Sequence, residues 1–242
     1  MKNAKIRLYV DADLADGQAV AVSRDQSHYL FGVMRLKEGA FVALFNGRDG
    51  EWLAKVTAAN KRNGMLVCLE QSKPVQMPPD LWLLFAPIKK ARTDFIVEKA
   101  AEMGAARICP VSTEFTQSDR VRQDRLQAHA LEAAEQCGGT YVPEVAELQK
   151  LDAVLANWPA DRKLLFCDET RVGEAVTDLT VLGAGPWAIL IGPEGGFSAR
   201  EVERLRGMDG VHSVSLGPRV LRADTAAVAA LALWQKALGD WG

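Results

Sequence analysis

Residues 187–201 read WAILIGPEGGFSARE, and residues 212–225 read HSVSLGPRVLRADT. Each segment begins as an apolar run and breaks at a Gly-Pro turn, after which the chain takes on a helical pattern. Ser198 followed by Glu201 is the capping-box signature of a helix start. The two segments therefore predict two successive strand–loop–helix units of an α/β sheet.

The same rhythm extends backwards through the second part of the chain. Apolar runs without strict alternation are separated by helical patterns near residues 94–103, 121–137, 199–207 and 225–238. Strands of this kind are buried on both faces, which is typical of a parallel sheet covered by helices. The runs are Leu81–Pro87, Arg107–Val111, Lys163–Cys167, Trp187–Gly192 and His212–Gly217.

The first part of the chain has a different pattern. Short runs of alternating apolar and polar residues at 6–10, 40–46, 51–56 and 65–70 are separated by turn dipeptides such as Asn46-Gly47. Frequent strands with tight turns predict a small β-barrel. The stretch SKPVQMPP at 72–79 reads as a linker. We therefore expect two domains, residues 1–75 and residues 76–242.

Composition limits the class of protein. Of the 242 residues, 48% are hydrophobic and 25% are charged, as in soluble globular proteins. No apolar run is long enough to span a bilayer or to resemble a signal peptide, so we expect a cytoplasmic protein without a membrane partner. The formal charge is +3 over residues 1–75 (11 basic, 8 acidic) and −5 over the rest (18 basic, 23 acidic). A basic N-terminal part is compatible with RNA recruitment.

Several common site types lack their sequence signatures. The four cysteines are isolated and lie far from the three histidines, so no metal site or disulfide framework is predicted. The dinucleotide-binding, P-loop and nucleophile-elbow patterns are absent as well. The sequence therefore gives no motif support for a nicotinamide-dependent oxidoreductase, an ATP-binding protein or a serine hydrolase.

The two Gly-Pro loops are the candidate ligand site. Each follows a strand at its carboxyl end, where open α/β sheets bind ligands, and glycines let a ligand approach the main chain. Glu194 lies inside the first loop, and Arg219 and Arg222 bracket an apolar pair in the second. No structural role for these charged residues is evident from the sequence, which favours a functional site over two ordinary turns.

At these residues the chain resembles a known family. IGPEGGFS at 191–198 and LGPRVLRADTAA at 216–227 are similar to the C-terminal signature of the 16S ribosomal RNA uridine-N3 methyltransferases of the SPOUT superfamily. Further similar segments, which extend the resemblance over nearly the whole chain, lie at Arg7, His28, 35–37, 46–47, Lys89, 95–104, 113–114 and 134–136. Phe115 and Gly139 stand where the family usually has arginines, which puts in doubt any phosphate contact at those positions.

The resemblance implies a fold, a cofactor and partners. It implies a SPOUT-type parallel sheet with a trefoil knot, a PUA-like N-terminal barrel, a homodimer, and 16S ribosomal RNA as substrate, either naked or within the assembled small subunit. The apolar segment 225–238 favours a buried or dimer-forming helix independently. The cofactor would be S-adenosylmethionine, in a pocket lined by Ile191, Gly192, Gly195, Gly196, Leu216, Gly217, Pro218 and Leu221.

The expected chemistry assigns roles to charged residues. Methylation at uridine N3 requires an unpaired base and the loss of a proton. A carboxylate can accept that proton and a guanidinium can stabilise charge on the uracil oxygens, which makes Glu194 and Arg222 the catalytic candidates. Basic side chains supply affinity for phosphate. The expected RNA contacts are Arg7, Arg35, Lys89, Lys90 and Arg92.

Two alternatives remain at this stage. A SPOUT methyltransferase could act on another RNA base or on a ribose 2′-oxygen, because loop chemistry alone does not choose the acceptor atom. A non-catalytic RNA-binding assembly factor could use the same two domains. The intact glycine loops favour the enzyme.

Overall fold

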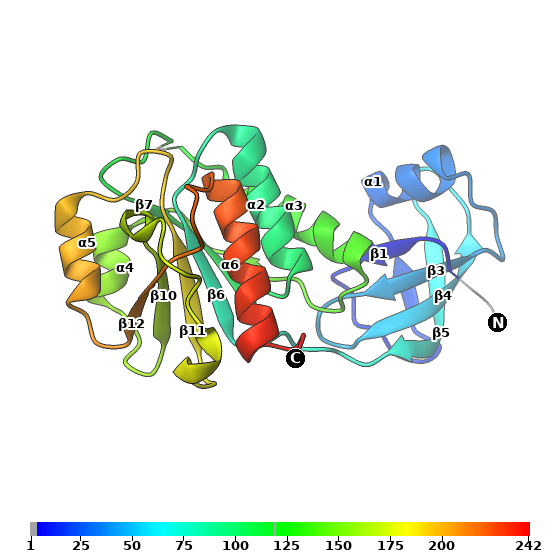
Figure 1. The fold of residues 1–242 in the computed structure, drawn as a ribbon. Coiled ribbons are helices and arrows are strands. Elements are labelled where there is room, and N and C mark those ends of the chain that lie inside the picture. Colours follow the sequence, from blue (N-terminus) through cyan, green and yellow to red (C-terminus); the bar gives the residue numbers. More distant parts are fainter. Residues whose placement is uncertain (1–3, 119) are drawn as a thin grey trace. The chain divides into compact units, whose positions relative to one another are not determined.

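The computed structural model describes residues 4–118 and 120–242, which form two units (Figure 1). The first unit contains the chain up to residue 77 together with residues 134–142. The second contains residues 78–133 and 143–242. Residues 134–142 pack with the first unit although 56 residues separate them from its main segment (78–133).

A five-stranded sheet forms the first unit. Its strand order is β1-β3-β4-β5-β2, with β1 parallel to β3 and the other pairs antiparallel. The strands are β1 (Arg7–Tyr9), β2 (Ala19–Ala21), β3 (Phe41–Phe45), β4 (Glu51–Ala58) and β5 (Met65–Lys73). The four runs seen in the sequence became β1, β3, β4 and β5, whereas β2 is only three residues long and has no pattern to detect.

Two short helical segments complete this unit. The helix α1 (Arg24–Ser27) begins at Ser23 with a capping box and continues into the π-helix η1 (His28–Val33). Arg35 follows in the left-handed region at φ 54°, and the chain turns there because the Leu36 amide donates to the Leu30 carbonyl. The Arg35 side chain is exposed.

A parallel sheet forms the second unit, as the sequence predicted. The strand order is β12-β10-β11-β6-β7-β8, β9 also pairs with β7, and every pairing is parallel. The strands are β6 (Leu81–Phe85), β7 (Arg107–Ser112), β8 (Glu144–Val145), β9 (Gln149–Lys150), β10 (Lys163–Cys167), β11 (Trp187–Ile191) and β12 (Val211–Val214). All five residues of β11 are buried, which explains its unbroken apolar sequence.

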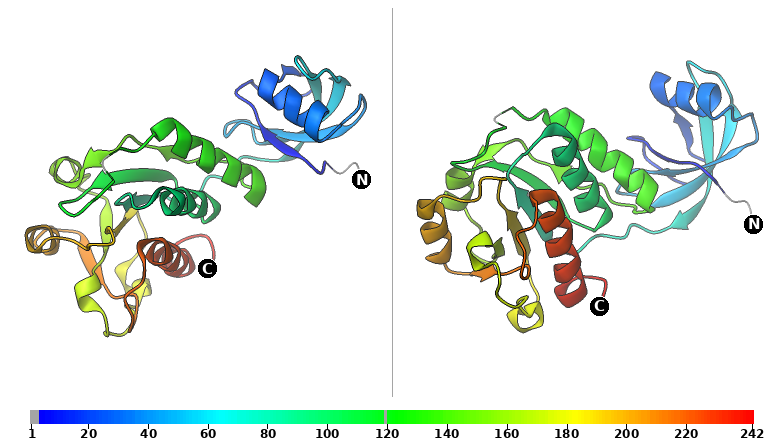
Figure 2. Two further views of the ribbon diagram at one scale, coloured as in Figure 1. Left: turned by 90° about the horizontal axis from the view of Figure 1, so that it is seen from above. Right: turned by 45° about the horizontal axis from the view of Figure 1, so that its top comes forward.

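Helices cover both faces of this sheet, and two separate apolar cores result (Figure 2). On one face pack α2 (Lys90–Glu102), α3 (Gln123–Cys137) and α6 (Ala223–Leu238), with α2 beside α6. On the other face pack α4 (Leu151–Ala156) and α5 (Ala199–Arg206). Two single-turn 3₁₀ segments, η2 (Glu169–Arg171) and η3 (Leu179–Leu182), follow β10. The expected α/β class is thus confirmed, and the trefoil knot stays a prediction.

The described part of the chain contains no helix that could span a membrane. None of its helices combines the length and the apolar character that crossing a bilayer needs.

Arg7 is held by several partners within the first unit. Its guanidinium donates to the Glu51 carboxylate at 2.6 Å and to the main-chain carbonyls of Ala134 at 2.7 Å, Glu135 at 2.8 Å and Gly139 at 2.7 Å. Only 16% of the side chain is exposed. An arginine with its donors occupied in this way ties the first unit together, and the expected contact of Arg7 with RNA stays a prediction.

Loss of Arg7 should therefore destabilise the protein. Burial raises the pKa of Glu51, but hydrogen bonds from Arg7 and Ser72 outweigh it and hold that pKa below the ordinary value. Removing the arginine leaves a buried carboxylate without its main partner, which typically costs about 3–5 kcal/mol. We expect Arg7→Ala to lower the free energy of unfolding by about that amount near pH 7, measured by denaturant titration.

The exposed pair between Arg48 and Asp13 provides the control. Arg48→Ala should cost less than about 1 kcal/mol, because exposed ion pairs contribute little. The Arg7 effect should also depend on pH. A carboxyl whose pKa is lowered on folding stabilises the protein above its unfolded-state pKa, near 4.5 for Glu51, and this contribution fades as the pH falls below it. This account would be contradicted if Arg7→Ala and Arg48→Ala lowered the free energy of unfolding by the same amount at pH 7.

Candidate functional site

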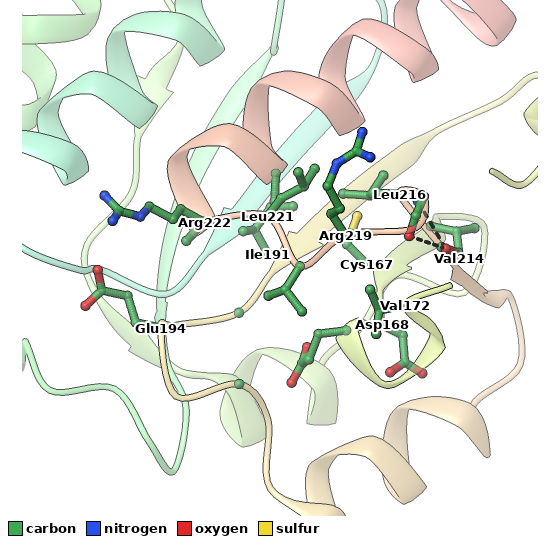
Figure 3. A pocket seen from close by; sticks show the side chains of 18 of the residues that line it. Cys167, Asp168, Val172, Ile191, Glu194, Val214, Leu216, Arg219, Leu221 and Arg222 are labelled. Atoms are coloured by element: carbon green, nitrogen blue, oxygen red, sulfur yellow. Dashed lines mark hydrogen bonds between the residues drawn. The ribbon is translucent and has the colours of Figure 1, made fainter. Parts of the chain in front are cut away.

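A hollow lies at the carboxyl ends of β10, β11 and β12 (Figure 3). Its cavity volume is about 230 Å³, somewhat below the roughly 300–1,000 Å³ of typical small-molecule sites. We call it the central pocket. Its lining comes from three chain segments: Cys167, Asp168, Glu169 and Val172; Ile191, Gly192, Pro193, Glu194 and Gly196; and Val214, Ser215, Leu216, Gly217, Arg219, Val220, Leu221, Arg222, Ala223 and Ala226.

The glycine loop after β11 is shaped by contacts that no larger residue would allow. Gly196 has φ 72°, and a Cβ atom there would lie 2.2 Å from the Glu169 carboxylate. That carboxylate accepts a hydrogen bond from the Phe197 amide at 2.9 Å. A Cβ atom at Gly192 would meet the Phe197 ring at 2.5 Å. Both glycines are therefore required by the packing of the loop itself.

The helix start beyond this loop is as the sequence predicted. Ser198 caps α5, its hydroxyl accepting from the Glu201 amide at 3.3 Å while the Glu201 carboxylate accepts from the Ser198 amide at 2.9 Å. Phe197 packs edge-on against Phe166 of β10, with ring centroids 5.1 Å apart. The capping box and this aromatic contact fix both ends of the loop.

Asp168 holds the segment after β10 in place. Its carboxylate accepts from the Thr170 amide at 3.0 Å, from Arg206 of α5 at 3.0 Å and from the Ser213 hydroxyl at 3.2 Å. Burial raises the pKa of Asp168, but the hydrogen bonds from Thr170 and Arg206 outweigh it, so the pKa lies below its ordinary value. Asp168 is thus an ionised structural anchor under the pocket.

Four charged residues lie near one end of the central pocket: Arg92, Glu194, Arg222 and Asp224. Arg92 of α2 lies 3.4 Å from the Glu194 carboxylate and 3.8 Å from Asp224. Glu194 and Arg222 both lie at this end in Figure 3, opposite Asp168 and Val172. Among the residues that the structure describes, the Arg222 side chain has neither a hydrogen bond nor an ion pair, and it is exposed. A carboxylate and a free guanidinium thus border the same space.

A second hollow adjoins the first. It lies between the segments after β6, β7 and β11 and shares Pro193 and Glu194 with the central pocket. We call it the side pocket. Its lining is Pro87, Ile88, Lys89, Lys90, Phe115, Gln117, Ser118, Pro193, Glu194 and Gly195.

The structure brings most of the expected site residues to these two pockets. Both catalytic candidates line the central pocket, as do Ile191, Gly192, Gly196, Leu216, Gly217 and Leu221. Gly195 borders the side pocket instead, and Pro218 borders neither. Lys89 and Lys90 line the side pocket.

The segment Cys167–Val172 was not among the predicted site residues, although it supplies one of the three lining segments of the central pocket. Its signal was the same as for the glycine loops, because Asp168 and Glu169 directly follow a buried strand at its carboxyl end. Without a glycine the segment did not stand out.

The site can bind an organic ligand with a polar rim. Apolar side chains such as Ile191, Leu216 and Leu221 suit a flat ring, while the Glu169 carboxylate has lone pairs left for hydroxyl or ammonium donors. Among residues 4–118 and 120–242, no group of three histidine, cysteine, aspartate or glutamate side chains is arranged to hold a metal ion.

Comparison with protein families agrees with this geometry. The model of an RNA methyltransferase domain matches residues 75–235, and the model of an RNA methyltransferase PUA domain matches residues 22–64. Among curated proteins, the chain is 31% identical to the ribosomal RNA small subunit methyltransferase E of Rickettsia conorii, over 93% of either chain. It is 25% identical to the protein of that name in Bacillus subtilis, over 90% of each.

Solved structures of similar proteins contain a cofactor. A Legionella pneumophila protein in complex with bound SAM superposes with a TM-score of 0.87 at 29% identity, covering 97% of this chain and 98% of the other. The ribosomal RNA small subunit methyltransferase E of Neisseria gonorrhoeae, bound to S-adenosyl methionine, gives 0.83 at 26% identity over 98% and 99%.

Proposed function

The chain belongs to the RNA methyltransferase family, and from this premise we propose that it methylates N3 of a uridine in small-subunit (16S) ribosomal RNA with S-adenosylmethionine. The observation that carries the proposal is the central pocket, in which two glycine loops and the Glu169 segment surround one hollow beside Glu194 and Arg222. Full-length similarity to small-subunit ribosomal RNA methyltransferases supports the substrate.

The pocket suits the cofactor. Its apolar wall fits an adenine ring, the main chain of both loops offers hydrogen bonds, and Glu169 fits ribose hydroxyls or the ammonium group. When bound, S-adenosylmethionine would supply its sulfonium methyl group, which the acceptor nitrogen attacks while the sulfur leaves as the neutral thioether S-adenosylhomocysteine. The protein then contributes mainly by positioning the acceptor and by handling one proton.

The acceptor atom requires both charged side chains at the end of the pocket. The N3 proton must leave as the N–CH₃ bond forms, and the Glu194 carboxylate accepts it directly or through water. Negative charge that develops on the two uracil oxygens is stabilised by the Arg222 guanidinium. Arg92, which was expected to contact RNA, pairs with Glu194 from α2, and we propose that it positions this carboxylate.

RNA recruitment divides between the two units in this proposal. Arg35 of the first unit and Lys89 and Lys90 at the side pocket are exposed cations suited to phosphate. A substrate in the small ribosomal subunit, naked or assembled, implies that the protein works in the cytoplasm. Methylation of a ribose 2′-oxygen is the weaker alternative, because a carboxylate and a guanidinium together match an imide better than an alcohol.

Gly196→Val tests the cofactor assignment. The side chain would collide with Glu169 and would strain a left-handed backbone. We expect calorimetric titration to find no measurable binding of S-adenosylmethionine to the folded variant. The matched control is Gly17→Val, since Gly17 has φ 71° with open space around it, and cofactor affinity there should equal that of the wild type. A folded Gly196→Val protein with wild-type affinity would remove this loop from the cofactor site.

The catalytic assignment is tested by separating binding from rate. Glu194→Gln should lower the rate of methyl transfer by about 10²–10⁴-fold, the usual contribution of a general base. Arg222→Ala should lower it by about 10²–10³-fold. Both variants should bind S-adenosylmethionine within a fewfold of the wild type. Glu203→Gln on the exposed side of α5 is the control, and a similar rate for Glu194→Gln and Glu203→Gln would refute the base assignment.

A homodimer is part of the proposal. Beyond its buried residues, α6 presents Val228, Ala229 and Ala232 half-buried and Leu233 37% exposed, and Trp241 beyond its end is 47% exposed. An apolar face of this kind is suited to a second copy. Light scattering should give twice the chain mass of 26.4 kDa, and Leu233→Asp should shift it towards one chain. Val181→Asp, at a 76% exposed site, is the control and should stay dimeric, whereas a monomeric wild type would contradict the dimer.

A further inference from the structure

Glu194 lines both pockets. The central pocket lies on one side of it and the side pocket on the other, and Pro193 borders both as well. A group in the side pocket therefore lies beside the same carboxylate that lines the central pocket. Under the proposed function, that is the place where an acceptor base must lie.

Phe115 is the unusual residue of the side pocket. It is 45% exposed although it is a large aromatic side chain, and it is the position at which this chain lacks the arginine expected from the resemblance. Gly195 allows its close approach to the glycine loop, because a Cβ atom there would lie 3.2 Å from the Phe115 Cβ. Phe115 thus lines the side pocket beside Gly195, with much of its surface exposed.

The segment that carries Phe115 is held on both sides. The Glu114 amide donates to the Glu201 carboxylate at 2.9 Å, and the Thr113 amide donates to the Thr116 hydroxyl at 2.8 Å. The Thr116 amide donates to the Thr113 carbonyl at 3.2 Å. An exposed aromatic ring on a turn that is held by hydrogen bonds is preorganised for stacking, because the turn loses little conformational entropy when a planar ligand binds.

Positive charge also borders the side pocket. Lys89 and Lys90 are exposed, and among the residues described neither side chain has an ion pair. A ring for stacking, two free ammonium groups and a carboxylate together match a nucleotide with its base, phosphates and an imide proton.

We propose that the side pocket binds the unpaired acceptor nucleotide of the RNA, with its base stacked on Phe115 and its phosphates near Lys89 and Lys90. This inference rests on the proposed function and assigns its acceptor site. It differs from electrostatic recruitment, since stacking depends on the aromatic face, whereas salt acts on the phosphate contacts.

Three substitutions at Phe115 separate stacking from packing. Against unmodified small-subunit ribosomal RNA made by transcription, Phe115→Ala should lower RNA affinity and kcat/KM roughly 5- to 150-fold, as for loss of one base–aromatic stack. Phe115→Leu keeps apolar bulk and should lose most of the same amount. Phe115→Tyr keeps the ring and should stay within about threefold of the wild type. Calorimetry should give unchanged S-adenosylmethionine affinity in all three.

Charge and position supply the controls. Lys89→Ala combined with Lys90→Ala should reduce the slope of log affinity against log salt by roughly 0.7 per lysine, whereas Phe115→Ala should leave that slope unchanged. Val181→Ala, an exposed apolar truncation that borders neither pocket, should change nothing.

The outcomes separate the two proposals. Wild-type RNA affinity in Phe115→Leu would show that Phe115 only fills space, and wild-type affinity in Phe115→Ala would remove it from the acceptor site; either overturns the inference. If the wild type binds RNA but transfers no methyl group, the proposed function fails, while the affinities of the Phe115 series still decide whether a base stacks there. A wild type that does not bind RNA overturns both.

Discussion

The hydrogen bond from the Phe197 amide to the Glu169 carboxylate sets the form of the whole site. It ties the glycine loop after β11 to the segment after β10, and the carboxylate fills the space that any side chain at residue 196 would need. The left-handed turn at Gly196 then directs the chain into the capped start of α5. Because β10 and β11 are neighbours in the sheet, this one contact joins two of the three segments that line the central pocket.

The order of the strands explains why two pockets adjoin at Glu194. The loop after β11 lies between the loops of β10 and β6, since β11 pairs with both strands. Its glycine end faces Glu169 and its Pro193–Gly195 side faces Lys89 and Phe115. One loop, which begins at the carboxyl end of the buried strand β11, can therefore serve a cofactor on one side and an acceptor on the other.

Local sequence signals predicted much of this arrangement, and the failures have physical reasons. The apolar runs and the Ser198–Glu201 capping box predicted β11 and α5 because burial and capping are written in neighbouring residues. The partners of Arg7 could not be predicted in this way, because Ala134 and Gly139 lie more than 120 residues away and offer only main-chain carbonyls. Glu169 follows a buried strand at its carboxyl end, which is a local signal, but its hydrogen bond to Phe197 depends on β10 and β11 being adjacent, which no local pattern states.

The central claim is that a methyl group reaches N3 of a uridine in small-subunit ribosomal RNA, and identification of the product tests it most directly. Unmodified RNA, naked and as assembled subunits, would be incubated with the wild-type protein and S-adenosylmethionine and then digested to nucleosides for mass spectrometry. We expect 3-methyluridine at a single site, and none when Glu194→Gln replaces the wild type over the same short incubation. A ribose-methylated nucleoside, a different methylated base, or no methylated nucleoside from either substrate would contradict the account.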